Sequence, residues 1–130
     1  MKKRILVVDD EPALTRMIKL NLERTGNYEV RTENEGSMAI PAAREFKPDL
    51  ILLDVMMPDM SGDEISALLK EDEELSQIPF IFMTAIVTRD ETEAMGSNIG
   101  GNEFLAKPVR TEELIAAIER APDASSRRTS

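Results

Sequence analysis

The sequence contains no cysteine and no histidine among its 130 residues. The absence of cysteine excludes disulfides and thiol chemistry, and the absence of histidine excludes a Ser-His-Asp triad. A zinc site built on histidine is excluded for the same reason. Any bound metal must therefore use oxygen ligands, which favours a hard cation such as Mg²⁺ or Ca²⁺.

Long hydrophobic runs are also absent. Lys2, Lys3 and Arg4 precede only a short apolar stretch that ends at Asp9, too short for a signal peptide or a membrane span. We therefore expect a cytoplasmic protein with no membrane partner. Acidic residues outnumber basic ones by 25 to 16, for a formal net charge of -9. This charge argues against direct nucleic-acid binding, which requires a basic face, but not against a basic partner protein.

Short apolar segments alternate with helical patterns along the whole chain. Strands are expected at residues 4–8, 28–32, 51–54, 79–85 and 102–106. Helices are expected from Pro12 to about residue 25, at 36–46, 62–70 and 88–97, and from Thr111 onward. Such alternation predicts a parallel sheet covered by helices on both faces. We expect one α/β domain over residues 1–121 and a small, polar, disordered tail over 122–130.

Three details of these helices can be tested. Met38 and Phe46 are expected on the inner face of the second helix, with Ala39, Ala42 and Ala43 between them. Pro41 conflicts with that helix, and either a kink, an irregular start or a late start would resolve the conflict. Ile65, Leu68 and Leu69 are expected to point inward from the third helix, and Thr111 to serve as the N-cap of the last.

The central strand runs directly into an acid. Ile51, Leu52 and Leu53 form an unbroken apolar run that ends at Asp54, and a loop containing Pro58 follows. This pattern is typical of a strand buried on both faces. Ligands of open α/β sheets bind just outside the carboxyl ends of the strands. Asp54 is therefore a candidate for chemistry, and a purely structural role at the strand end is the alternative.

Other expected strands also end in polar residues. Asp9 and Asp10 follow the first, Thr84 ends the fourth and Lys107 follows the fifth. Neighbouring carboxylates repel one another unless a cation neutralises them, and Mg²⁺ suits this role because it also bridges to phosphate oxygens. The set predicts phosphoryl transfer to Asp54, with Thr84 and Lys107 stabilising the moving charge. Taken singly, each residue could instead be a helix cap, a strand-end hydroxyl or a surface lysine.

Four segments together resemble a response-regulator receiver domain of two-component signalling. They are ILVVDDEP at 5–12, PDLILLDVMMPDMSG at 48–62, FIFMTA at 80–85 and EFLAKPV at 103–109. The resemblance covers residues 3 to about 121. It implies a flavodoxin-like, doubly wound fold: a five-stranded parallel sheet of order 2-1-3-4-5 flanked by five helices. It also implies a phosphoacceptor switch that assists its own phosphorylation and dephosphorylation and is not an enzyme in the usual sense.

The resemblance further assigns the acidic residues. Asp54 would be the phosphoacceptor, taking its phosphoryl group from a sensor histidine kinase or a phosphotransfer protein. Asp10, Asp54 and the backbone carbonyl of Met56 would bind Mg²⁺ directly, and Asp9 would act through water.

The remaining assignments concern the switch. Thr84 and Lys107 would hold the phosphoryl group. Phe104 lies at the position of an aromatic switch residue, which turns inward as Thr84 moves. A downstream protein would bind the face made by the fourth helix, the fifth strand and the fifth helix.

Two other classes of function compete with a receiver. A Mg²⁺-dependent phosphohydrolase of the haloacid-dehalogenase type also uses a strand-end aspartate, but it requires a second acid two residues later, where this chain has Met56. A receiver-like scaffold that is never phosphorylated would not need the complete set of acids. The tail is too short for a DNA-binding module, so the chain is either a stand-alone receiver or part of a longer regulator.

Overall fold

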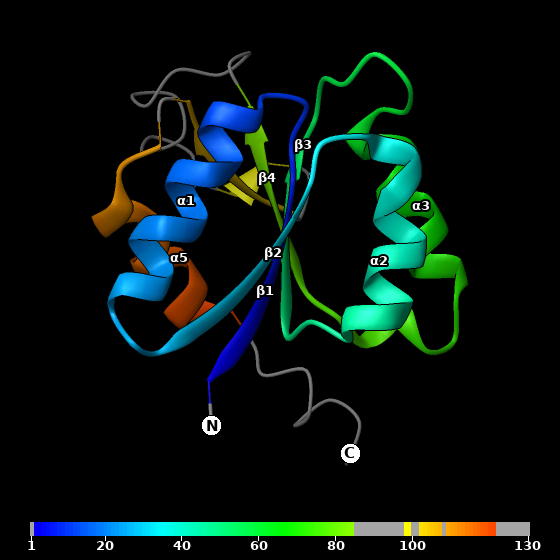
Figure 1. The fold of residues 1–130 in the computed structure, drawn as a ribbon. Coiled ribbons are helices and arrows are strands. Elements are labelled where there is room, and N and C mark those ends of the chain that lie inside the picture. The colour runs from blue at the N-terminus through cyan, green and yellow to red at the C-terminus, as the bar shows by residue number, and fades with distance from the viewer. Residues whose placement is uncertain (1, 85–97, 100–101, 108, 122–130) are drawn as a thin grey trace.

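The structure, a computed structural model, describes residues 2–84, 98–99, 102–107 and 109–121. The helix expected at 88–97 and the tail expected at 122–130 lie outside these residues. The chain forms an α/β sandwich with a central sheet (Figure 1). The parallel strands are β1 (Lys3–Val8), β2 (Tyr28–Glu33), β3 (Leu50–Asp54), β4 (Phe80–Thr84) and β6 (Asn102–Ala106).

The order of these five parallel strands is β2-β1-β3-β4-β6, which confirms the predicted 2-1-3-4-5 arrangement. A sixth strand, β5 (Asn98–Ile99), pairs antiparallel with β6 at the edge of the sheet and was not predicted. In this pairing Ile99 lies opposite Asn102 and Asn98 opposite Glu103. Because β5 has only two residues, it carries no periodic pattern that could have revealed it.

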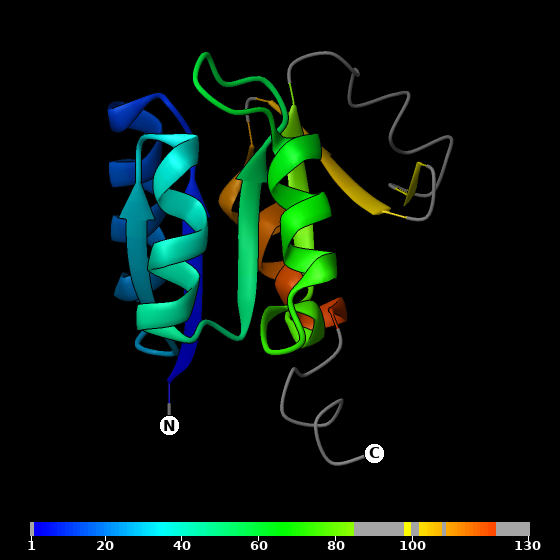
Figure 2. The same ribbon diagram turned by 90° about the vertical axis from the view of Figure 1, so that its right-hand side faces the viewer.

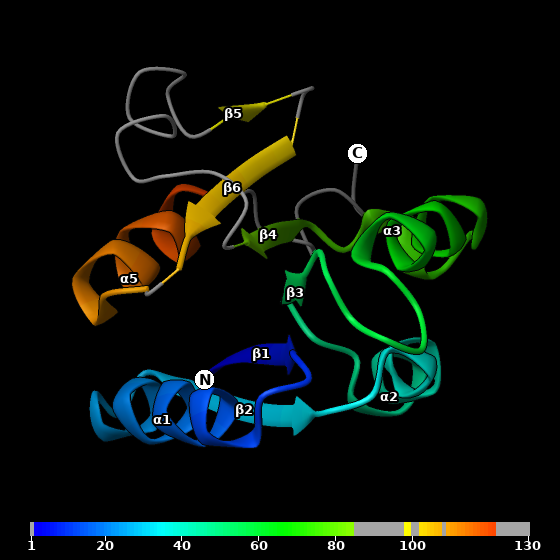
Figure 3. The same cartoon turned by 90° about the horizontal axis from the view of Figure 1, so that it is seen from above.

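Helices cover both faces of the sheet. Helices α1 (Pro12–Arg24) and α5 (Thr111–Arg120) lie on one face, and α2 (Ala39–Phe46) and α3 (Gly62–Glu71) lie on the other (Figure 3). Alternate strand residues point to opposite faces, so each strand contributes to two separate apolar cores. Ile5 and Val7 of β1, for example, join the core under α1 and α5, whereas Leu6 and Val8 join the core under α2 and α3. Among the described residues, no helix has both the length and the apolar character that crossing a membrane requires.

Strand β3 occupies the centre of the sheet between β1 and β4. All five of its residues are buried, which confirms the interpretation of the apolar run that ends at Asp54. The parallel strands point toward the same edge, where the loops to the following helices begin (Figure 2). Asp54 therefore lies at the carboxyl edge of the sheet, flanked by the ends of two neighbouring strands.

The conflict at Pro41 is resolved by an irregular start. A short 3-10 helix, η1 (Gly36–Met38), precedes α2, and Pro41 is the third residue of α2. The backbone N–H groups of the first turn have no partner within a helix, so the missing N–H of proline costs nothing there.

Three predictions of detail were wrong. Met38 and Leu68 are 40% and 42% exposed, whereas Ile65 and Leu69 fill the contact of α3 with the sheet. The N-cap of α5 is Arg110, and Thr111 is the first residue of the helix. The Thr111 hydroxyl instead accepts a hydrogen bond from Asn21 Nδ2 of α1 at 3.2 Å, and Glu113 Oε1 accepts from the Arg110 backbone N–H at 3.4 Å.

Gly62 allows the β3–α3 loop to fold back onto the end of the central strand. A Cβ atom at this position would lie 2.6 Å from the backbone oxygen of Asp54 and 2.9 Å from Val55 Cα. We expect Gly62→Ala to lower the free energy of unfolding by about 1–3 kcal/mol, because backbone atoms cannot move aside locally. Urea denaturation would measure this loss, with the exposed position Ala67→Ser expected to stay within about 0.5 kcal/mol of the parent. A Gly62→Ala variant as stable as the control would contradict the close packing of this loop.

Candidate functional site

Three acidic side chains meet at the carboxyl edge of the sheet. Strands β1 and β3 are neighbours, with Val8 paired to Leu53, so the residues that follow them lie side by side. One carboxylate oxygen from each of Asp9, Asp10 and Asp54 lies within 4.8 Å of the others. Asp9 is 0% exposed and Asp54 is 3% exposed, whereas Asp10 is exposed. The cluster therefore has two buried acids and one that opens to solvent.

The amine of Lys107 reaches this cluster from the end of β6. Lys107 Nζ lies 2.7 Å from Asp9 Oδ2 and 3.3 Å from Asp54 Oδ1, and its side chain is only 13% exposed. The backbone N–H of Lys107 donates to the Thr84 carbonyl at 2.9 Å, which ties this residue to the end of β4. Three strand ends thus contribute side chains to the site, and the end of β4 holds the Lys107 backbone in place.

Burial and mutual repulsion shape the protonation of these groups. Burial, followed by the charge of Asp9, raises the pKa of Asp54 to about 6. Burial also raises the pKa of Asp9, although the contact with Lys107 opposes this shift. For Lys107, burial would lower the pKa, but the carboxylates of Asp9, Asp54 and Glu11 outweigh it and the pKa is raised. One cation against several acids leaves the cluster with an excess of negative charge.

The arrangement fits a hard divalent cation. Asp9 Oδ2 is buried and, apart from its ion pair with Lys107, accepts no hydrogen bond among the described residues. Together with the carboxylates of Asp10 and Asp54, it offers the oxygen donors that Mg²⁺ prefers. Close carboxylates that share a single ammonium group also repel one another unless further positive charge is bound. These observations make the edge a candidate Mg²⁺ site.

Three further residues were predicted for the site. Met56 donates its backbone N–H to Asp54 Oδ1 at 3.4 Å, while its side chain faces outward and the residue is 64% exposed. Thr84 is buried at the end of β4. Phe104 lies further down β6, where its half-buried ring packs against Phe82 with centroids 5.2 Å apart. The aromatic ring therefore belongs to the core under α2 and α3.

Glu11 contacts the site but was not among the predicted site residues. Its carboxylate lies 3.3 Å from Lys107 Nζ, and its backbone N–H donates to Asp9 Oδ1 at 3.0 Å. The only signal in the sequence is that Glu11 continues the acidic run after β1, and such a position usually indicates a helix start. A contact with a residue 96 positions away could not be inferred from that pattern.

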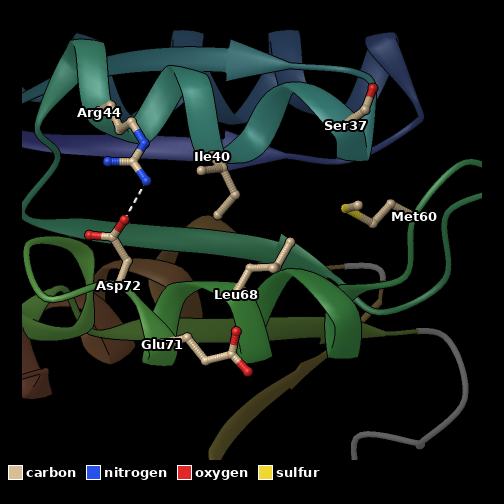
Figure 4. A pocket seen from close by; sticks show the side chains of 7 residues that line it. All are labelled: Ser37, Ile40, Arg44, Met60, Leu68, Glu71 and Asp72. Atoms are coloured by element: carbon tan, nitrogen blue, oxygen red, sulfur yellow. Dashed lines mark hydrogen bonds and ion pairs between the residues drawn. The ribbon is translucent and has the colours of Figure 1, made fainter.

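A separate groove of about 370 Å³ lies between α2 and α3. Ile40, Met60 and Leu68 provide its apolar surface, and an ion pair between Arg44 and Asp72 spans one end (Figure 4). None of the predicted site residues lines this groove.

Known sequences match this chain over most of its length. Residues 5–119 match the family model of the response regulator receiver domain. The DNA-binding response regulator MtrA of Mycolicibacterium smegmatis is 36% identical over 118 residues, which cover 91% of this chain and 50% of that protein. The alkaline phosphatase synthesis transcriptional regulatory protein PhoP of Bacillus subtilis is 36% identical over 121 residues, covering 92% and 48%. The chain thus spans about half the length of the curated relatives it matches.

Solved structures are similar over nearly the whole chain. The chemotaxis protein CheY4 of Vibrio cholerae superimposes with a TM-score of 0.79 at 26% identity, covering 94% of this chain and 100% of that one. The N-terminal domain of a response regulator receiver protein from Methanoculleus marisnigri gives a TM-score of 0.67 at 36% identity, covering 91% and 94%.

Proposed function

We propose that this chain, which belongs to the response regulator receiver domain family, accepts a phosphoryl group on Asp54 and thereby switches a protein-binding surface. Membership of the family makes it a phosphoacceptor signalling module of two-component systems and not a conventional enzyme. The observation that best supports Asp54 as the acceptor is the position of Lys107 Nζ, 3.3 Å from Asp54 Oδ1 and 2.7 Å from Asp9 Oδ2. A cation is thus already in place where phosphoryl charge would arrive.

In the proposed reaction a carboxylate oxygen of Asp54 attacks the phosphorus of a phosphohistidine. An O–P bond forms, the P–N bond breaks, and the imidazole leaves after taking up a proton. With its pKa at about 6, Asp54 is mostly a carboxylate at neutral pH, which is the form able to attack. Lys107 neutralises the transferring oxygens, and Thr84, buried at the adjacent strand end, would donate to them.

The same proposal assigns Mg²⁺ to the acid cluster. Asp10, Asp54 and the backbone carbonyl of Met56 would hold the ion directly, and Asp9 would hold it through water. When bound, Mg²⁺ supplies positive charge that offsets both the clustered carboxylates and the phosphoryl oxygens. One carboxylate oxygen from each of Asp9, Asp10 and Asp54 lies within 4.8 Å of the others, and this clustering supports the assignment.

We further propose the partners and the switch. The phosphoryl donor would be a sensor histidine kinase or a phosphotransfer protein, and the site would lie within a cytoplasmic domain of residues 1–121. Thr84 and Phe104 would form the switch, and the half-buried Phe104 ring packs against Phe82. A downstream protein would bind the face that includes β6 and α5. Direct DNA contact by this region is not proposed, because its formal net charge is -9.

Incubation with a small phosphodonor would separate a receiver from a hydrolase. With acetyl phosphate and Mg²⁺, we expect about one phosphoryl group per chain, because a phosphoacceptor has a single nucleophile to occupy. With p-nitrophenyl phosphate and Mg²⁺, we expect no sustained release of nitrophenol. Intact-mass spectrometry and absorbance would measure these outcomes. Steady turnover of the phosphoester without a stable adduct would contradict the receiver function and favour a phosphohydrolase.

A further inference from the structure

Glu11 lies at the start of α1, but its side chain does not cap the helix. It is the N-cap residue of that helix, yet its side chain accepts no capping hydrogen bond. The carboxylate instead extends toward β6, where Glu11 Oε1 lies 3.3 Å from Lys107 Nζ. A side chain that bypasses the nearby helix N–H groups to pair with this lysine contributes to the site, not to the helix end.

Lys107 is thus shared among three carboxylates of unequal burial. An ammonium group has three N–H donors, and Asp9, Glu11 and Asp54 lie within ion-pair distance of it. The side chains of Asp9 and Asp54 are 0% and 4% exposed, whereas that of Glu11 is 63% exposed. When an oxygen of a phosphoryl group needs one of these donors, the Glu11 contact costs least to break, because water readily solvates an exposed carboxylate.

We infer that Glu11 is a positioning residue: it holds the Lys107 amine in the resting protein and competes with the phosphoryl group for it. This inference rests on the proposed function and concerns its regulation. The contact stabilises the resting arrangement, so it slows phosphorylation of Asp54 and weakens binding of a phosphoryl mimic. Removing the Glu11 charge while keeping the shape of the side chain releases the amine toward Asp54.

A simpler effect, general repulsion of an anionic donor by any nearby acid, predicts the same direction. Glu35 offers the matched control, because it follows the end of β2 at the same edge, is exposed, and caps η1 without a side-chain hydrogen bond. Among the residues that the structure describes, no ion pair involves Glu35. Glu35→Gln removes the same charge from this edge without touching Lys107.

The test uses two readouts, one with Mg²⁺ and one without. Titration with beryllofluoride and Mg²⁺ should show affinity about 2- to 5-fold tighter in Glu11→Gln than in the parent, the range expected for loss of one exposed ion pair. In metal-free protein, acylation of the Lys107 amine, followed by peptide mass spectrometry, should accelerate by about the same factor because the amine is less restrained. Neither the beryllofluoride affinity nor the acylation rate of Lys107 should change in Glu35→Gln.

A double-mutant cycle completes the design. In a Lys107→Met background, Glu11→Gln should leave the beryllofluoride affinity unchanged, because Glu11 acts only through the missing amine. Equal effects of Glu11→Gln and Glu35→Gln would overturn the inference, since general repulsion would then explain both. Weaker Mg²⁺ binding with slower phosphorylation in Glu11→Gln would overturn it too, by showing that Glu11 holds the metal. If the parent bound no beryllofluoride, the proposed function would fail, and the acylation rates would still decide whether Glu11 restrains Lys107.

Discussion

Asp54→Asn is expected to abolish incorporation of phosphate from acetyl phosphate, with the initial rate falling by about 100-fold or more, because a neutral amide is a poor nucleophile toward phosphorus. The substitution is close to isosteric, so the buried strand end should keep its shape. Asp54 is 3% exposed, so the variant side chain would occupy the same buried position. Labelling of parent and variant with radioactive acetyl phosphate in the presence of Mg²⁺ would measure the rates.

The chemistry of the label gives an independent check. A phosphoryl group on Asp54 is an acyl phosphate, so hydroxylamine should release it and leave an aspartyl hydroxamate at that residue. Asp63→Asn, which removes an exposed acid at the start of α3, should label at the rate of the parent. Label that persists in Asp54→Asn, or that resists hydroxylamine in the parent, would exclude Asp54 as the acceptor.

Lys107→Met is expected to lower the free energy of unfolding of the metal-free protein by about 3 kcal/mol at pH 7.5. Removing the ammonium group leaves the buried carboxylates without a counter-charge. Lys107 Nζ lies within 3.3 Å of carboxylates on both Asp9 and Asp54, whose side chains are 0% and 4% exposed. No other described basic side chain contacts either of these two acids. Guanidinium chloride denaturation of parent and variant would measure the difference.

The free energy of unfolding that is lost in Lys107→Met should depend on pH. The pKa of Asp54 is about 6 in the folded protein, above its ordinary value of 3.8, so the folded state holds a proton that the unfolded chain has lost. The contribution of this group is therefore most favourable below pH 4 and is lost as the pH rises through about 6. Without Lys107 the pKa values of Asp9 and Asp54 should rise further. The deficit of Lys107→Met should thus be smaller at pH 5 than at pH 8.

Mg²⁺ provides the second arm of this experiment. A cation bound at the acid cluster replaces the missing ammonium charge, so millimolar Mg²⁺ should stabilise Lys107→Met more than it stabilises the parent. Lys19→Met is the control, because Lys19 forms an exposed ion pair with Glu23 and its loss should cost about 1 kcal/mol or less at either pH. A Lys107→Met protein as stable as the control, with no response to pH, would show that the cluster does not depend on this amine.

Local patterns determined most of the fold and of the acid site. The apolar run that ends at Asp54 predicted a strand buried on both faces, and β-α alternation predicted parallel strands whose polar ends share one edge. That reasoning placed Asp9, Asp54 and Lys107 at one edge of the sheet. The strand order implied by the receiver resemblance brought them together, and the structure agrees. Such features are readable from sequence because each depends on residues within one strand or one turn.

Only the tertiary structure decided how neighbouring residues differ. Asp9 and Asp10 are adjacent in the sequence, yet Asp9 is buried against Lys107 at the end of β6 and Asp10 is exposed. The contact between Glu11 and Lys107 joins residues 96 positions apart and depends on where β6 lies relative to α1. The exposure of Leu68 depends on the packing of α3 against α2 and the sheet. Each of these outcomes follows from how separate elements pack, and no local pattern carries that information.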